Sequence, residues 1–150
     1  MIEWFLERGT DVNVRDPLGR SMLHQTAFQA CTKSVKLLLG KGANPMAKDS
    51  FGQIPLHMAC GDKLPDTEKV FEMLLEAGCD PNCKDENGDT PLHIAARSCY
   101  KTAISILRGG GRADLLATNI RGNTPMHEAM DVYGVADGER SLNYEELGPI

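Results

Sequence analysis

The chain has 150 residues, of which 41% are hydrophobic and 25% are charged. This length and composition fit one globular domain and exclude a disordered chain. The formal net charge of −5 argues against a phosphate-binding surface spread over the whole domain, so we expect no nucleic-acid partner.

The sequence also indicates the compartment. No apolar run approaches the roughly 20 residues of a membrane helix, so we expect no membrane partner. The first residues are acidic early and contain no apolar stretch typical of a signal peptide. Without a secretory signal, the five cysteines are interpreted as free thiols in a reducing compartment. We therefore expect an intracellular protein of the cytoplasm or nucleus.

A unit of about 33 residues recurs along the chain. All four histidines occupy one register, five residues after a glycine and eight residues after an Asp or Asn: His24, His57, His93 and His127. An Asp-x-x-Gly string predicts a tight turn, because glycine adopts backbone angles that other residues resist. A fixed period of this length is typical of stacked repeats that share one continuous core.

Each unit predicts two helices after its turn. Thr90 and Thr124 are expected N-caps, and Pro91 and Pro125 suit the first helical position, where a missing N–H costs nothing. A short helix rich in small residues is followed by a bulkier aliphatic helix and a glycine turn. In chain order we expect a partial repeat at 2–15, full repeats at 16–48, 49–84 and 85–118, a partial repeat at 119–131, and an acidic tail or degenerate last repeat at 132–150.

These strings resemble the ankyrin-repeat family. The stretch from Asp85 to Ala96, Asp-Glu-Asn-Gly-Asp-Thr-Pro-Leu-His-Ile-Ala-Ala, follows the family pattern closely, as does Leu74 to Asn82. The resemblance covers roughly residues 2 to 130. It implies an all-α repeat solenoid, with a tight β-turn or hairpin and two antiparallel helices in each of about four repeats. Because Trp4 and Phe5 suggest an uncovered apolar edge, we also expect either a piece of a longer array, with further repeats before the N-terminus, or a truncated product.

The histidines and cysteines invite a metal-site interpretation that their placement disfavours. Stacked repeats lie about 10 Å apart, too far for two histidines to share one zinc, whose ligand bonds are about 2 Å long. The resemblance implies that each histidine forms hydrogen bonds within its turn. The cysteines take positions that usually hold small residues. We therefore expect no metal, no cofactor and no catalytic residue.

The resemblance implies a protein partner bound by the hairpin tips and the concave face of the first helices. Three tips carry an apolar residue one or two positions before their glycine. Exposed apolar strips flanked by arginines often mark interaction sites. Isolated surface apolar residues are also ordinary. The candidate protein-binding residues are Leu18, Arg20, Phe28, Phe51, Gln53, Asp62, Asn87, Asp89, Arg97, Ile120 and Arg121.

Two further expectations concern modification and charge. Asn82 occupies the position at which, in this family, an asparaginyl hydroxylase acts. Residues 119–150 contain two arginines and six acidic residues, so 2 − 6 gives −4 of the net charge. This end could steer a basic partner segment, or be a solvated tail.

The function predicted is a non-enzymatic protein-interaction scaffold. One alternative is a targeting module of a larger enzyme or an adaptor of a ubiquitin ligase. Another is an inhibitor that masks a basic segment of a transcription factor. Fold alone does not choose among them.

Overall fold

The computed structural model describes residues 2–61, 64–109 and 112–132. These ranges contain no strand, and one isolated bridge joins Arg15 and Ser21. None of their helices is both long and apolar enough to span a bilayer. The described helices are α1 (Ile2–Glu7), α2 (Met22–Phe28), α3 (Thr32–Gly40), α4 (Pro55–Ala59), α5 (Thr67–Glu76), α6 (Pro91–Arg97), α7 (Lys101–Gly109) and α8 (Pro125–Val132).

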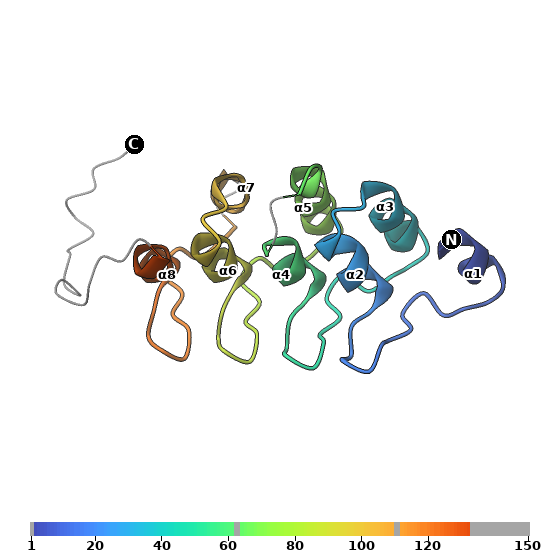
Figure 1. Ribbon diagram of the computed structural model, residues 1–150, viewed down its shortest axis with the longest axis horizontal. Coiled ribbons are helices and arrows are strands. Elements are labelled where there is room, and N and C mark those ends of the chain that lie inside the picture. Colours follow the sequence, from blue (N-terminus) through green and yellow to red (C-terminus); the bar gives the residue numbers. More distant parts are fainter. Residues whose placement is uncertain (1, 62–63, 110–111, 133–150) are drawn as a thin grey trace.

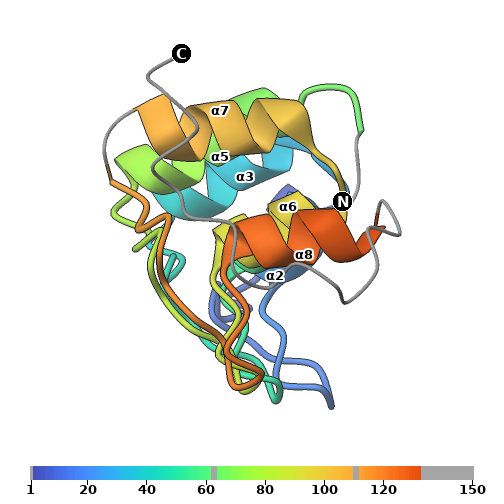
Figure 2. The ribbon, with the colours of Figure 1, turned by 90° about the vertical axis from the view of Figure 1, so that its left-hand side faces the viewer.

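The helices form two rows. Helices α2, α4, α6 and α8 lie side by side in one row, and α3, α5 and α7 lie in the other (Figure 1). Within each unit the first helix packs against the second: α2 on α3, α4 on α5, and α6 on α7. The turn-bearing loops before the first helices all project from the same side of the rows (Figure 2). The predicted all-α repeat solenoid is confirmed.

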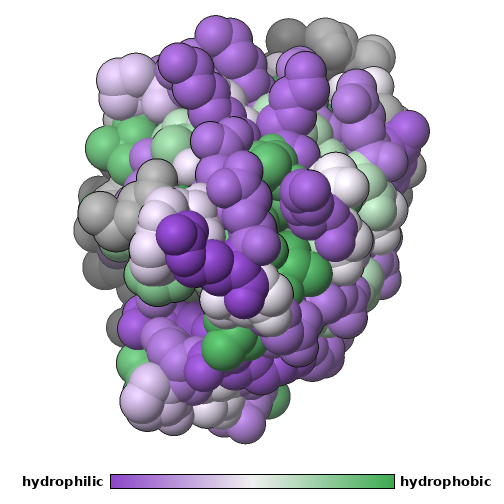
Figure 3. Space-filling model, turned by 90° about the vertical axis from the view of Figure 1, so that its right-hand side faces the viewer, coloured by the Kyte–Doolittle hydropathy of each residue, from purple (hydrophilic) through white to green (hydrophobic). Residues whose placement is uncertain are grey.

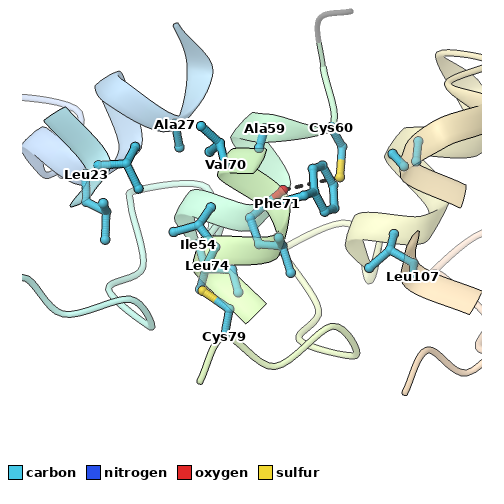
Figure 4. Close-up of a cluster of buried hydrophobic side chains, with 14 of the residues drawn as sticks. Leu23, Ala27, Ile54, Ala59, Cys60, Val70, Phe71, Leu74, Cys79 and Leu107 are labelled. Atoms are coloured by element: carbon cyan, nitrogen blue, oxygen red, sulfur yellow. Dashed lines mark hydrogen bonds between the residues drawn. The ribbon is translucent and has the colours of Figure 1, made fainter. Parts of the chain in front are cut away.

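The core runs between the rows as a continuous strip. The second helices supply large aliphatic and aromatic side chains, with Leu38, Phe71 and Leu107 at most 1% exposed. The first helices supply small ones such as Ala27 and Ala59, which let the rows approach closely. Figure 4 shows Ala59 of α4 near Val70 and Phe71 of α5, with Ala27 of α2 and Leu107 of α7 on either side. No single unit could bury this strip alone, so adjacent repeats depend on one another.

Three cysteines belong to the same core, as their small-residue positions predict. Cys60, Cys79 and Cys83 are buried, and no cysteine of the chain forms a disulfide in the described structure. Figure 4 shows Cys60 beside Phe71, with its Sγ–H donating to the Leu56 carbonyl at 3.2 Å. Burial raises the pKa of the Cys79 thiol to about 12. These buried thiols therefore stay protonated and act as packing groups.

The predicted turns and helix starts are confirmed. The Gly19, Gly52, Gly88 and Gly122 amides each donate to the carbonyl of the Asp or Asn three residues earlier, at 2.8 to 3.1 Å. All four glycines have a positive φ, between 71° and 77°. Helices α6 and α8 begin at the prolines that follow Thr90 and Thr124.

The end of the stack formed by α1 is less covered than the interior. Counted back four residues from the glycine of the following turn, Phe5 corresponds to Leu38 and Leu74. Leu38 and Leu74 are fully buried, whereas Phe5 is 46% exposed. Beside it, the Arg8 guanidinium lies 3.7 Å from the centroid of the Trp4 ring. Figure 3 views this end, where hydrophobic surface lies between hydrophilic side chains.

Candidate protein-interaction surface

The loop tips form a continuous edge because each loop is bonded to the next. The Ser50 amide donates to the Leu18 carbonyl at 2.9 Å, and the Glu86 amide donates to the Phe51 carbonyl at 3.0 Å. The Ile120 amide makes the same bond to the Asn87 carbonyl at 3.0 Å. These bonds, in addition to the packing of the helices, hold the tips of four repeats in one row.

Apolar side chains along this edge face solvent. Leu18, Phe51 and Ile120 are 42% to 74% exposed, and Phe28 at the end of α2 is 41% exposed. Asn87 is also exposed. Because large apolar groups on a rigid edge are poorly hydrated, they are suitable anchors for a partner. These five candidate residues lie where the sequence places them.

Arg20 and Gln53 are half-buried and held by neighbouring carboxylates. The Arg20 guanidinium pairs with Asp16 at 2.8 Å, and the Gln53 side-chain amide donates to Asp85 at 3.2 Å. Their side chains therefore present defined orientations beside the tips. Asp62 lies outside the described residues.

Asp89 corrects the expectation of an exposed tip residue. Its side chain is buried, and Oδ2 accepts from the Arg97 guanidinium at 2.6 Å. Its Oδ1 accepts from the Asn119 amide at 2.7 Å. Neighbouring polar side chains cover this carboxylate, so it does not face a partner, and only the less buried Arg97 remains at the surface.

The sequence interpretation missed Glu128, the centre of this cluster. The side chain is 2% exposed, and Oε2 accepts from Arg97 Nε at 2.9 Å. Its Oε1 accepts from a second arginine and two amides: Arg121 at 2.5 Å, Asn119 at 2.8 Å and Asn123 at 3.1 Å. The equivalent positions after the other histidines hold the uncharged residues Gln25, Met58 and Ile94. A carboxylate at this position in only one repeat was the sequence signal that could have identified Glu128.

The hydrogen bonds set the charge state of Glu128. Burial alone would raise its pKa, but the bonds from Arg97, Asn123 and Asn119 outweigh burial and lower the pKa to about 2. The carboxylate is therefore ionised at neutral pH and orients Arg97 and Arg121, which are both partly exposed. Two of the predicted arginines are thus presented to solvent in fixed positions.

The histidines stabilise the loops. His24 Nδ1 accepts from the Ser21 amide at 3.0 Å, so Nε2 carries the proton and donates to the Gln53 carbonyl of the next repeat at 2.9 Å. His57 and His93 repeat this arrangement, donating to the Asp89 and Asn123 carbonyls. The predicted structural role is confirmed. In the described part of the chain, no three His, Cys, Asp or Glu side chains gather where they could hold a metal ion.

Asn82 also joins two repeats. Its amide nitrogen donates to the Arg112 carbonyl at 2.7 Å, and its amide oxygen accepts from the Asp114 N–H at 2.7 Å. Hydroxylation of Asn82 stays a prediction. The acidic stretch expected to attract a basic segment lies mostly in 133–150, outside the described residues.

Stacked units of one loop and two helices, joined by recurring loop and histidine bonds, define a helical repeat protein. The family model for ankyrin repeats (3 copies) matches residues 1–85 and 64–136. The chain belongs to the ankyrin-repeat family. The resemblance seen in the sequence is therefore confirmed for family and fold. Ankyrin repeats are generally protein-interaction modules.

Curated relatives match shorter parts of the chain. B-cell lymphoma 3 protein of Homo sapiens is 31% identical over 65 residues, covering 43% of this chain and 14% of that protein. Inversin of Gallus gallus is 40% identical over 63 residues, covering 42% and 6%. Protein phosphatase 1 regulatory subunit 27 of Mus musculus is 36% identical over 59 residues, covering 39% and 38%. The chain therefore spans well under half of the length of each of these relatives.

Proposed function

We propose that this chain is a non-catalytic scaffold that binds a partner protein along its loop tips and first-helix face. The observation that carries the proposal is the pair of exposed apolar residues Leu18 and Phe51 on loops bonded to one another, together with the exposed Phe28 at the end of α2. A rigid surface loses little conformational entropy on binding, so its apolar contacts contribute more of their gross energy to affinity.

The oriented arginines support the same proposal. Arg97 and Arg121 continue the edge beyond Phe51, and Glu128 limits their rotamers. Arginine is among the residues that contribute most at protein interfaces. The exposed apolar residues Leu18 and Phe51 would supply most of the affinity. Arg97 and Arg121 would select a partner that carries hydrogen-bond acceptors at one end of its binding segment.

The relatives support a regulatory setting. One is named as a regulatory subunit of protein phosphatase 1, and another as Ankyrin repeat and SOCS box protein 3. We accordingly propose that this array acts as a regulator or adaptor in a larger assembly, within the cytoplasm or nucleus. The free thiols of the described residues are consistent with a reducing compartment.

Site-specific crosslinking tests the binding edge. A photo-reactive phenylalanine analogue at Phe51 should crosslink a partner in a cell extract, and the double variant Leu18→Ser/Phe51→Ser should no longer retain that partner in a pulldown. Leu116→Ser is the matched control, because Leu116 is exposed but lies away from the tips. Equal loss with Leu116→Ser, or undiminished capture by the double variant with an unchanged circular dichroism spectrum, would contradict the proposal.

A further inference from the structure

A second, basic row follows the arms of the loops. The residue directly before each turn aspartate is a cation: Arg15, Lys48 and Lys84. All three are exposed. Each reaches forward by one repeat to a backbone carbonyl. Arg15 donates to the Lys48 carbonyl at 2.5 Å, Lys48 to the Lys84 carbonyl at 3.3 Å, and Lys84 to the Thr118 carbonyl at 2.7 Å.

These bonds hold the cations in place without neutralising them. In the described ranges, none of the ion pairs includes Arg15, Lys48 or Lys84. A backbone carbonyl carries no net charge, and it occupies one of the three donors of an ammonium group. Lys84 therefore keeps two donors for an incoming acceptor, and Lys48, whose side chain also bonds the Cys83 thiol, keeps one.

The carboxylates that follow the two lysines in sequence are turned away from this row, and Asp16, which follows Arg15, is paired with Arg20. Asp49 and Asp85 follow Lys48 and Lys84 directly, but both are buried. Asp49 Oδ1 accepts from the Phe51 and Gln53 amides at 2.9 Å. Asp85 Oδ1 accepts from two amides of its own loop in the same way. Lys48 and Lys84 thus face solvent, whereas the carboxylates of Asp49 and Asp85 are enclosed by their own loops.

The spacing of the row limits what would fit it. Packed repeats recur at about 10 Å. A polyproline II segment advances about 3.1 Å per residue with three residues per turn, so every third side chain lies on one face at about 9.3 Å. In a β-strand, side chains alternate between the two faces, so residues three positions apart point in opposite directions and cannot both face the row. Phosphates of a nucleic-acid strand lie much closer together, and the chain's net charge of −5 opposes a long polyanion.

We propose that Arg15, Lys48 and Lys84 form a second binding surface, for an acidic polypeptide segment in the polyproline II conformation with a carboxylate at every third residue. One carboxylate would face each cation. The surface is separate from the apolar edge in the residues it uses, so this proposal goes beyond the proposed function, and either can fail while the other holds.

Fluorescence anisotropy with a labelled (Glu-Pro-Pro)5 peptide tests the proposal on the whole chain. We expect saturable binding that weakens with salt. The charge-reversed (Lys-Pro-Pro)5 peptide should not bind. A peptide of the same composition, with its glutamates clustered at one end, should bind more weakly than the regular peptide. No saturable binding of (Glu-Pro-Pro)5 up to 1 mM, or equal binding of the clustered peptide, would overturn the proposal.

Paired variants locate the binding. Lys48→Ser/Lys84→Ser should weaken the (Glu-Pro-Pro)5 affinity by about fivefold, as expected for the loss of two exposed ion pairs. Lys36→Ser/Lys41→Ser is the matched control, since it removes the same charge from exposed positions on and just after α3, and it should change the affinity by less than about twofold. Equal losses in both variants would show charge attraction alone. Tighter binding of a (dT)15 oligonucleotide than of the peptide would assign the surface to phosphates instead. Either result would overturn the proposal.

Discussion

Arg97 and Glu128 join the first helices of two adjacent repeats through a bond of 2.9 Å between Nε and Oε2. The two residues are 31 positions apart and lie on α6 and α8. Glu128 is almost completely buried, whereas Arg97 keeps part of its guanidinium at the surface. The pair therefore links the packing of the last described repeat to the presentation of a candidate binding residue.

Replacing Glu128 by Gln should destabilise the array. The substitution removes the charge and one acceptor from a site bonded by two arginines and two amides, which costs about 1–3 kcal/mol for buried groups left unsatisfied. Urea unfolding followed by circular dichroism measures the change. Glu86→Gln is the control, because Glu86 is exposed at a loop tip. Equal unfolding midpoints for the two variants would contradict this prediction.

The pKa of Glu128 predicts an acid-dependent loss of stability. Its folded-state pKa of about 2 lies below the value of about 4.3 for an unfolded glutamate. The unfolded chain therefore takes up the proton first. The stabilisation is complete above about pH 5 and declines as pH falls toward 2. Thermal midpoints measured from pH 7 to pH 2 should converge for the native chain and Glu128→Gln. A difference that stays constant over this range would exclude Glu128 as the cause.

Two glycines in equivalent turns should tolerate alanine unequally. Gly88 and Gly122 both have a positive φ, which strains alanine by about 1 kcal/mol. A Cβ at Gly88 would also lie 3.0 Å from the Ile120 nitrogen, whereas a Cβ at Gly122 meets nothing within 4 Å. Gly88→Ala should therefore lower the unfolding free energy more than Gly122→Ala in matched denaturant titrations. The reverse order would show that the contact between loops is not close.

Asn82→Ala should cost about 1–2 kcal/mol, because it removes two hydrogen bonds between repeats. Asn87→Ala provides the comparison: Asn87 is exposed, and its bond to the next loop uses the backbone carbonyl, which the substitution retains. Differential scanning calorimetry should show a lower midpoint only for Asn82→Ala. Hydrogen exchange at the Asp114 amide should also accelerate. Unchanged exchange there would mean that the side chain does not hold the loop.

The repeat period made the local structure predictable. The turn at Gly88 and the helix start at Pro91 depend on a few adjacent residues, and their chemistry is visible in one short string. The burial of Asp89 could not be predicted from the residues adjacent to it in the sequence. Its equivalents Arg20 and Gln53 remain half-buried, and Asp89 differs because Arg97 and Asn119 close over it. Partners that lie 8 and 30 residues away become neighbours only after the repeats stack.

The first three loops each accept one backbone hydrogen bond from the next loop, and His24, His57 and His93 each donate one to a carbonyl of the following repeat. Removal or duplication of one complete unit would therefore rejoin equivalent donors and acceptors at the new junction. Removal of half a unit would leave a ring nitrogen and a carbonyl without partners. The length of the array is thus free to change in whole units during evolution, with one tip gained or lost at each step. The register of a bound partner along the edge can be altered in the same way, without replacement of any residue that it already contacts.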